Sequence, residues 1–142
     1  MDVLDIRDLE SSVPGLNFVR GDGRSLSGIG DETYDVVTSL HAIEHFGLGR
    51  YGDPIDPMGY KSAVNAFFRV LRPGGHLILG FPAGKGEVLF NAQRLLSITE
   101  VLAIVPAEVV EIVQTDGTGS TQPIEGPIED FYGCVGLILR KN

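Results

Sequence analysis

The segment HAIEHF, residues 41–46, carries the side chains best suited to chemistry, namely His41, Glu44 and His45. An imidazole titrates near an unperturbed pKa of about 6.5, so His41 or His45 could take the proton of an attacking hydroxyl group as a general base. The alternative is structural, with Glu44 and His45 capping or hydrogen-bonding around a short helix. The sequence leaves both interpretations open.

The same spacing matches H-x-x-E-H, the inverted zinc-peptidase pattern in which two histidines bind the metal and the glutamate is the base. On a helix, His41 and His45 would share one face. A peptidase needs a long motif helix and a third protein ligand. Here the motif follows a strand, and the available acids are the distant Glu111, Glu125 and Glu129. We therefore assign no metal ligand.

A small or acidic residue also ends each of three predicted strands in succession. These residues are Asp5, followed by Ile6; Asp22, followed by Gly23; and Ser39, followed by Leu40. In an open parallel sheet the ligand lies beyond the carboxyl ends of the strands. An acid there can accept both hydroxyls of a ribose, and an acid followed by a small residue can hold an adenine edge. Each acid alone is an ordinary turn residue, so it is the succession that indicates a site.

Short apolar runs predict the strands that position these residues, at 3–6, 16–19, 34–40, 76–81, 108–113 and 133–139. Three of the runs are nearly continuous, which is typical of strands covered by helices on both faces. A helix is expected from Asp56 and Pro57 to Leu71, and a second from the Ser97 capping box to Pro106. Residues 115–127 read as an exposed loop. The pattern predicts an α/β fold with a mostly parallel sheet.

The composition describes one globular domain, residues 1–142, with 43% hydrophobic residues and the single cysteine Cys134. A formal net charge of −8 argues against nucleic acid as a partner. We find no apolar run long enough to cross a membrane and no secretory signal, so we expect a cytoplasmic protein.

The matching pieces of a family resemblance are VLDIR, NFVRGDGRSL, YDVVTSLHAIEHF and FFRVLRPGGHLILGFP. Together they resemble the second to fifth strands of a class I S-adenosylmethionine-dependent methyltransferase, and EVVEIVQ with FYGCVGLILRK resembles its antiparallel last two strands. The resemblance implies a Rossmann-like fold with an antiparallel final strand and S-adenosylmethionine as cofactor. It places Asp5 at the ribose hydroxyls, Asp22 and Gly23 at the adenine, and residues 39–41 near the methionine end, with Ile6 as a further cofactor-binding residue.

The chain departs from that family at its start. Such enzymes begin with a strand and an E/D-x-G-x-G-x-G turn, and this chain begins after them. The missing strand belongs in the middle of the sheet, so its loss would leave a gap of roughly 10 Å at ~4.8 Å per strand. The chain is a shortened product, or its strands close up in another order, or a second chain supplies the pairing. Exposed strand edges favour a homo-oligomer.

Other motifs are weaker. The G-x-G-x-x-G of Gly47, Gly49 and Gly52 follows no strand and precedes no helix directly, so we interpret it as a loop whose Arg50 and Tyr51 could meet substrate. The surrounding GLGRYGDPIDP is similar to an insertion in uncharacterised methyltransferase-like proteins of polysaccharide clusters. Some O-methyltransferases carry a metal-binding E-x-x-E-H after the corresponding strand, and His41 replaces its first glutamate.

Four phenylalanines at positions 67, 68, 81 and 90 are expected in the core, because no basic residues are densely interleaved with them.

Two functions follow. The first is methyl transfer from S-adenosylmethionine to an unidentified small-molecule or saccharide-like acceptor, in which alignment supplies much of the rate. The second is a methyltransferase-derived binding module that lacks the glycine turn and is completed by oligomerisation or by a partner.

Overall fold

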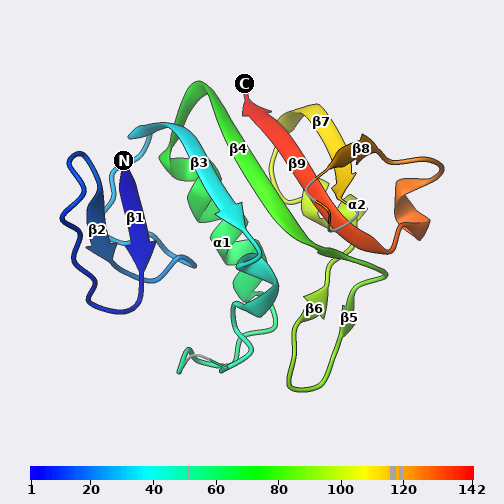
Figure 1. The fold of residues 1–142 in the computed structure, drawn as a ribbon, viewed down its shortest axis with the longest axis horizontal. Coiled ribbons are helices and arrows are strands. Elements are labelled where there is room, and N and C mark those ends of the chain that lie inside the picture. The colour runs from blue at the N-terminus through cyan, green and yellow to red at the C-terminus, as the bar shows by residue number, and fades with distance from the viewer. Residues whose placement is uncertain (51, 116–117, 119) are drawn as a thin grey trace.

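The computed structural model describes residues 1–50, 52–115, 118 and 120–142 (Figure 1). The elements in chain order are β1 (Asp2–Asp5), β2 (Asn17–Arg20), β3 (Tyr34–Leu40), the 3-10 turn η1 (Ile43–His45), α1 (Gly59–Val70), β4 (Leu71–Ala83), β5 (Glu87–Val88), β6 (Arg94–Leu95), α2 (Ile98–Leu102), β7 (Ala107–Thr115), β8 (Thr121–Pro123), the 3-10 turn η2 (Ile128–Asp130) and β9 (Gly133–Lys141).

Five strands form the main sheet in the order β3-β4-β9-β7-β8. β3 and β4 are parallel, whereas the final strand β9 lies antiparallel between β4 and β7. β4 and β7 therefore run in the same direction. This arrangement confirms the predicted α/β class, with mostly parallel strands and an antiparallel final strand.

β1 and β2 pair with each other in parallel and form a sheet of their own. In Figure 1 this sheet lies beside β3, with β1 nearer to it. The described strands have not closed up in another order, because neither β1 nor β2 pairs with the main sheet. β1 and β3 therefore do not pair with each other.

The core lies on one face of the main sheet. The fully buried leucines of β4 and β9 pair across the strands, Leu77 with Leu139 and Leu79 with Leu137. Helices α1 and α2 add buried side chains to the same core cluster. On the opposite face Ile78 and Ile138 are only half-buried. The expectation of helices on both faces is therefore wrong for the described residues, because both α-helices pack into one cluster.

Several element boundaries differ from the sequence-based prediction. The expected loop 115–127 contains β8, which extends the edge of the sheet by pairing with the end of β7. Helix α1 begins at Gly59, because the Asp56 carboxylate accepts from the backbone N–H of Met58 and closes a turn before it. The small hairpin β5–β6 was not predicted.

The second helix starts as its sequence predicts. The Ser97 hydroxyl oxygen accepts from the backbone N–H of Glu100 at 3.3 Å, which is the capping half of the S-x-x-E box. The helix ends at Leu102, a turn before Pro106. Among the described residues no helix is long and apolar enough to span a membrane.

Of the four phenylalanines expected in the core, Phe67 and Phe81 are buried and Phe68 packs partly buried against it. Phe90 is the exception. It lies at the tip of the β5–β6 hairpin and is 99% exposed. The position shows that the local apolar run Val88–Phe90 belongs to a protruding turn rather than to a core strand.

Candidate functional site

Asp5 ends β1 and its carboxylate is held by the residue two positions later. It accepts from the backbone N–H of Arg7 at 2.9 Å and from the Arg7 guanidinium at 2.9 and 2.8 Å. These donors hold the pKa of the Asp5 carboxyl well below its usual range, chiefly through the side-chain hydrogen bonds. Ile6 between them is half exposed. Asp5 therefore presents an ionised, acceptor-only group at the strand end.

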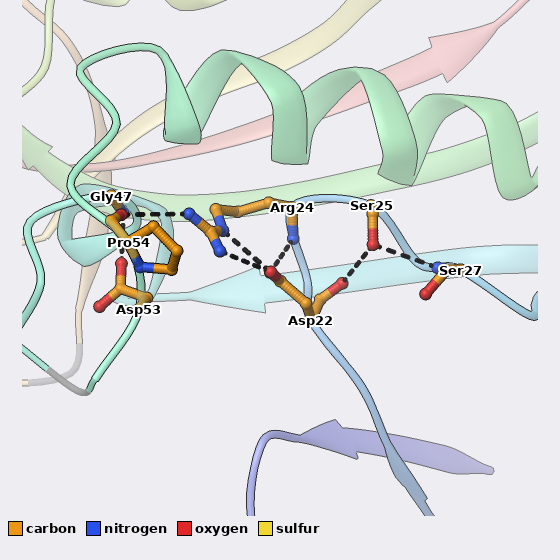
Figure 2. Close-up of polar contacts among 7 residues, drawn as sticks. All are labelled: Asp22, Arg24, Ser25, Ser27, Gly47, Asp53 and Pro54. Carbon is orange, nitrogen blue, oxygen red and sulfur yellow. Dashed lines mark hydrogen bonds and ion pairs between the residues drawn. The ribbon is translucent and has the colours of Figure 1, made fainter.

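Asp22 repeats the same arrangement after β2. Its carboxylate accepts from the backbone N–H of Arg24 and from the Arg24 guanidinium, with the shortest contact at 2.7 Å (Figure 2). These hydrogen bonds lower the pKa of Asp22. Arg24 also donates to the carbonyl oxygen of Pro54, which ties the loop after β2 to residues 47–54. Asp22 is thus both a strand-end carboxylate and an anchor for a neighbouring loop.

Gly23, Ser39 and Leu40 share one cavity of about 630 Å³. Its lining also includes Leu4, Ala42 and Phe46, so the carboxyl ends of β1 and β3 and the loop after β2 meet around it. The cavity falls within the usual range of ligand pockets. Asp5, Asp22 and His41 each adjoin a lining residue in the chain. The structure thus brings the predicted strand-end residues into one neighbourhood.

Gly23 packs closely against two side chains of the cavity. A Cβ there would lie 3.0 Å from the ring of Phe46 and 3.7 Å from a methyl carbon of Leu4. A larger residue at this position would require the Phe46 ring to shift.

The HAIEHF residues form a cluster around a buried carboxylate. Glu44 is 1% exposed, and its Oε1 lies 3.4 Å from His41 Nδ1 and 3.9 Å from His45 Nε2. Glu44 Oε2 is buried and has no hydrogen-bond partner among the described residues. Buried carboxylate oxygens are costly without a partner, so this atom marks a place that a bound group could satisfy.

His41 adopts a backbone conformation that few bulky residues take. Its φ is +50°, in the left-handed region, and its backbone N–H donates to the carbonyl oxygen of Gly80 at 2.7 Å. The side chain is 53% exposed, whereas His45 is largely buried. Such strain at a strand end is common at functional sites.

The glycine pattern at 47, 49 and 52 is a loop, as expected. Gly47 has φ +75°, and a Cβ there would lie 2.0 Å from the carbonyl oxygen of Asp56, so only glycine fits. Arg50 donates to the carbonyl oxygens of Asn91 and Ala92 in the β5–β6 hairpin. The predicted substrate contact of Tyr51 lies outside the described residues.

Sequence reasoning missed Arg94, a buried cation. Its guanidinium donates to the carbonyl oxygens of Phe46 and Asp56 and stacks on the ring of Tyr60 at 5.4 Å. Burial lowers its pKa. Nothing in the local sequence distinguishes it from a surface arginine. Arg7 and Arg24 had a visible signal, the D-x-R spacing repeated at two strand ends.

No group of three or more potential metal ligands occurs among the residues that the structure describes. The three residues of HAIEHF come together as one carboxylate between two imidazoles.

The fold is that of S-adenosylmethionine-dependent methyltransferases. The chain superposes on one from Methanosarcina mazei with a TM-score of 0.59 and 15% identity, covering 89% of this chain and 67% of that one. The N-methyltransferase NodS from Bradyrhizobium japonicum WM9, in complex with S-adenosyl-L-homocysteine, gives 0.60 and 17%, covering 99% and 65%. The [4+2]-cyclase SpnF gives a TM-score of 0.57 and 16% identity, covering 89% of this chain and 56% of SpnF.

The chain therefore spans between about half and two thirds of the length of these solved structures. No curated protein matches it. A family model described as "Caenorhabditis protein of unknown function, DUF268" matches residues 7–125. The chain belongs to this family.

Proposed function

We propose that residues 1–142 act as one domain that transfers a methyl group from S-adenosylmethionine to a small-molecule or saccharide-like acceptor. The observation that carries the proposal is the pair of ionised carboxylates, Asp5 and Asp22, which follow two neighbouring parallel strands in a methyltransferase fold. The complex of NodS with S-adenosyl-L-homocysteine supports the choice of cofactor.

The residues present suit the nucleoside end of this cofactor. Carboxylates accept hydrogen bonds from ribose hydroxyls and from an adenine amino group, and the cavity beside them is largely apolar. Arg7 is mostly exposed, so it can turn away and release the Asp5 oxygens to a ligand. The proposed contacts are Asp5 and Ile6 with the ribose, Asp22 and Gly23 with the adenine, and Ser39 and Leu40 toward the methionine.

S-adenosylmethionine supplies a methyl group activated on a sulfonium. The chain's own contribution is to align an acceptor with that methyl group and to remove its proton. His41 is the more exposed imidazole of the cluster, so it is best placed to accept a proton from an acceptor hydroxyl. Glu44 would hold His41 and His45 through Oε1 and stabilise the protonated imidazole.

A binding module without catalysis is the second candidate. It is favoured by the separation of β1 and β2 from the main sheet.

We further propose that the chain forms a homo-oligomer in the cytoplasm and takes no nucleic-acid partner. Val109 and Val110 on β7 are about half exposed, and β8 covers only the end of that strand, from Val113 to Thr115. Two copies could pair along this free edge about a two-fold axis. The free thiol of Cys134 fits a reducing compartment.

Calorimetric titration of the chain with S-adenosylmethionine tests the proposal. We expect a Kd in the micromolar range, about −8 kcal/mol. Asp5→Ala and Asp22→Ala should each weaken binding about tenfold, because a charge-assisted hydrogen bond contributes roughly 1.5–3 kcal/mol.

Asp130→Ala is the matched control, since Asp130 forms an exposed ion pair with Lys85 at 3.4 Å and neither residue lines the cavity. It should leave the affinity unchanged. An absence of binding by the unsubstituted chain up to millimolar cofactor would reject the enzyme and favour the binding module.

A further inference from the structure

A second cavity, of about 270 Å³, lies between two projecting segments of the chain. Its lining includes Gly47 and Ile55 of the loop after η1, and Val88 and Arg94 of the β5–β6 hairpin. Figure 1 shows that the loop and the hairpin project from the same end of the molecule. The Arg50 guanidinium of the loop donates to two carbonyl oxygens of the hairpin, so the two segments are held together. We call this feature the small cavity.

The buried Arg94 brings unused hydrogen-bond donors to the small cavity. Its side chain carries five N–H groups, and the residue is 6% exposed. Its hydrogen bonds to the backbone carbonyl oxygens of Glu44, Phe46 and Asp56 use at most three of these groups. At least two N–H groups therefore have no partner in the part of the chain that the structure describes. Buried donors are costly without a partner, so they indicate a bound group that accepts hydrogen bonds.

Two further side chains bring acceptors to the small cavity. The Tyr60 hydroxyl donates to Glu100 Oε2 at 3.3 Å, and both residues line the cavity. The Arg94 guanidinium lies 5.4 Å from the centre of the Tyr60 ring, so the cation and the phenol are neighbours. Tyr60 is 7% exposed, whereas Glu100 is exposed. The cavity thus combines N–H donors with phenol and carboxylate oxygens.

This combination selects the chemistry of the ligand. An anionic group would be repelled by Glu100, a cationic group would be repelled by Arg94, and an apolar molecule would leave the polar groups unpaired. A neutral group with several hydroxyls satisfies both kinds of partner, because each hydroxyl donates and accepts. Leu48, Ile55 and Val88 add apolar walls that suit the apolar face of a sugar ring.

The small cavity adjoins the proposed reaction centre. Phe46 lines the cavity of about 630 Å³ proposed for the cofactor, and Gly47, the next residue in the chain, lines the small cavity. Arg94 donates to the backbone carbonyl oxygen of Glu44, the residue whose carboxylate contacts His41. A ligand in the small cavity would therefore lie beside the segment that carries the proposed general base.

We infer that the small cavity binds one neutral saccharide unit, with Arg94 donating to its hydroxyl oxygens and with Tyr60 and Glu100 accepting from its hydroxyl groups. The inference rests on the proposed function only where it makes this saccharide the methyl acceptor. The binding itself depends on the small cavity alone.

A titration of the ¹⁵N-labelled full chain followed by nuclear magnetic resonance tests the inference. The probes are the methyl glycosides of glucose, galactose and mannose, each added with and without S-adenosyl-L-homocysteine. At least one should shift the amide signals of Gly47 and Gly86, which line the small cavity, with a Kd of about 1–10 mM. A lack of saturable shifts with all three sugars in both conditions would overturn the inference.

A charged relative of the sugar that binds best tests the charge argument. In its uronic acid a carboxylate replaces the neutral hydroxymethyl group, which places an anion near Glu100. This probe should bind about threefold or more weakly than the neutral sugar. Tighter binding of the uronic acid would show that the cavity selects anions, and would overturn the assignment of a neutral ligand.

Two substitutions locate the binding without disturbing the backbone contacts of Arg94. Glu100→Gln and Tyr60→Phe each remove a polar contact to the sugar and should weaken binding roughly three- to tenfold. Glu108→Gln is the matched control for the first, because Glu108 is an exposed acid on β7 outside the cavity lining, and it should bind as the unsubstituted chain does. Equal affinities of Glu100→Gln and Glu108→Gln would overturn the inference.

The calorimetric titration with S-adenosylmethionine separates this inference from the proposed function. Saccharide binding by a chain that does not bind the cofactor would reject methyl transfer and support the small cavity as a saccharide site. Cofactor binding with no saccharide binding would overturn this inference and leave methyl transfer in place.

Discussion

The two sheets of this molecule differ in how they are held. The central strands β4 and β9 carry leucines that are completely buried against helices, whereas no residue of β1 or β2 is fully buried. Two-stranded sheets are marginal in water unless they pack against something else. The main sheet is thus stabilised by its own core, and the β1–β2 sheet depends on what lies beside it.

The loss of a core side chain should show this difference most strongly. Phe81 on β4 is completely buried, so Phe81→Ala should lower the free energy of unfolding by about 3–5 kcal/mol. Leu4→Ala on β1 removes a half-buried side chain and should cost about 1 kcal/mol. Urea denaturation followed by circular dichroism measures both. Equal costs would contradict the view that β1 and β2 are weakly attached.

The main sheet and its helices were largely predictable from the sequence. Continuous apolar runs, the Ser97 cap and the apolar stripe of α1 are local signals that the core reinforces. The β5–β6 hairpin and β8 were not predictable, because each strand is only two or three residues long and gains its pairing from the rest of the fold. The exposure of Phe90 was not predictable for a similar reason, since the identity of an apolar residue does not show whether the fold buries it.

The candidate site was predictable in its positions but not in its partners. Strand ends are readable from sequence, so Asp5, Asp22 and Ser39 were found. The capture of both carboxylates by neighbouring arginines depends on turn geometry. The contact of Glu44 with two imidazoles depends on the left-handed backbone at His41, which no composition rule gives. The roles of these residues remain predictions.

The link between the two sheets gives a smaller effect. Tyr34→Phe removes the hydrogen bond to Asp2 and should destabilise the β1–β2 sheet by about 0.5–1.5 kcal/mol. Amide exchange in β1 should accelerate while exchange in β4 stays the same. Tyr132→Phe is the matched control, since it removes an exposed bond to Glu87 at 2.9 Å in another part of the molecule. Acceleration in β1 by the control variant would refute the assignment.

Acidification should also destabilise the β1–β2 sheet, and this effect should be the smallest of those considered. The pKa values of Asp2, Asp5 and Asp22 are all lowered in the folded chain by hydrogen bonds, chiefly to Asn17, Arg7 and Arg24 respectively. Their stabilisation is therefore complete above the ordinary aspartate pKa of about 3.9 and is lost as the pH falls from there through the lowered folded values. Solvent screening keeps the contribution of each exposed carboxylate small.

Amide exchange measured at about pH 6 and about pH 3 tests this localisation. Protection in β1 and β2 should fall at the lower pH while β4 and β9 keep theirs, because the three carboxylates all lie within the first 22 residues. Asp22→Asn should reduce the pH dependence in β2, and Asp31→Asn should not. A loss of protection that is equal in both sheets would mean that they unfold as one unit.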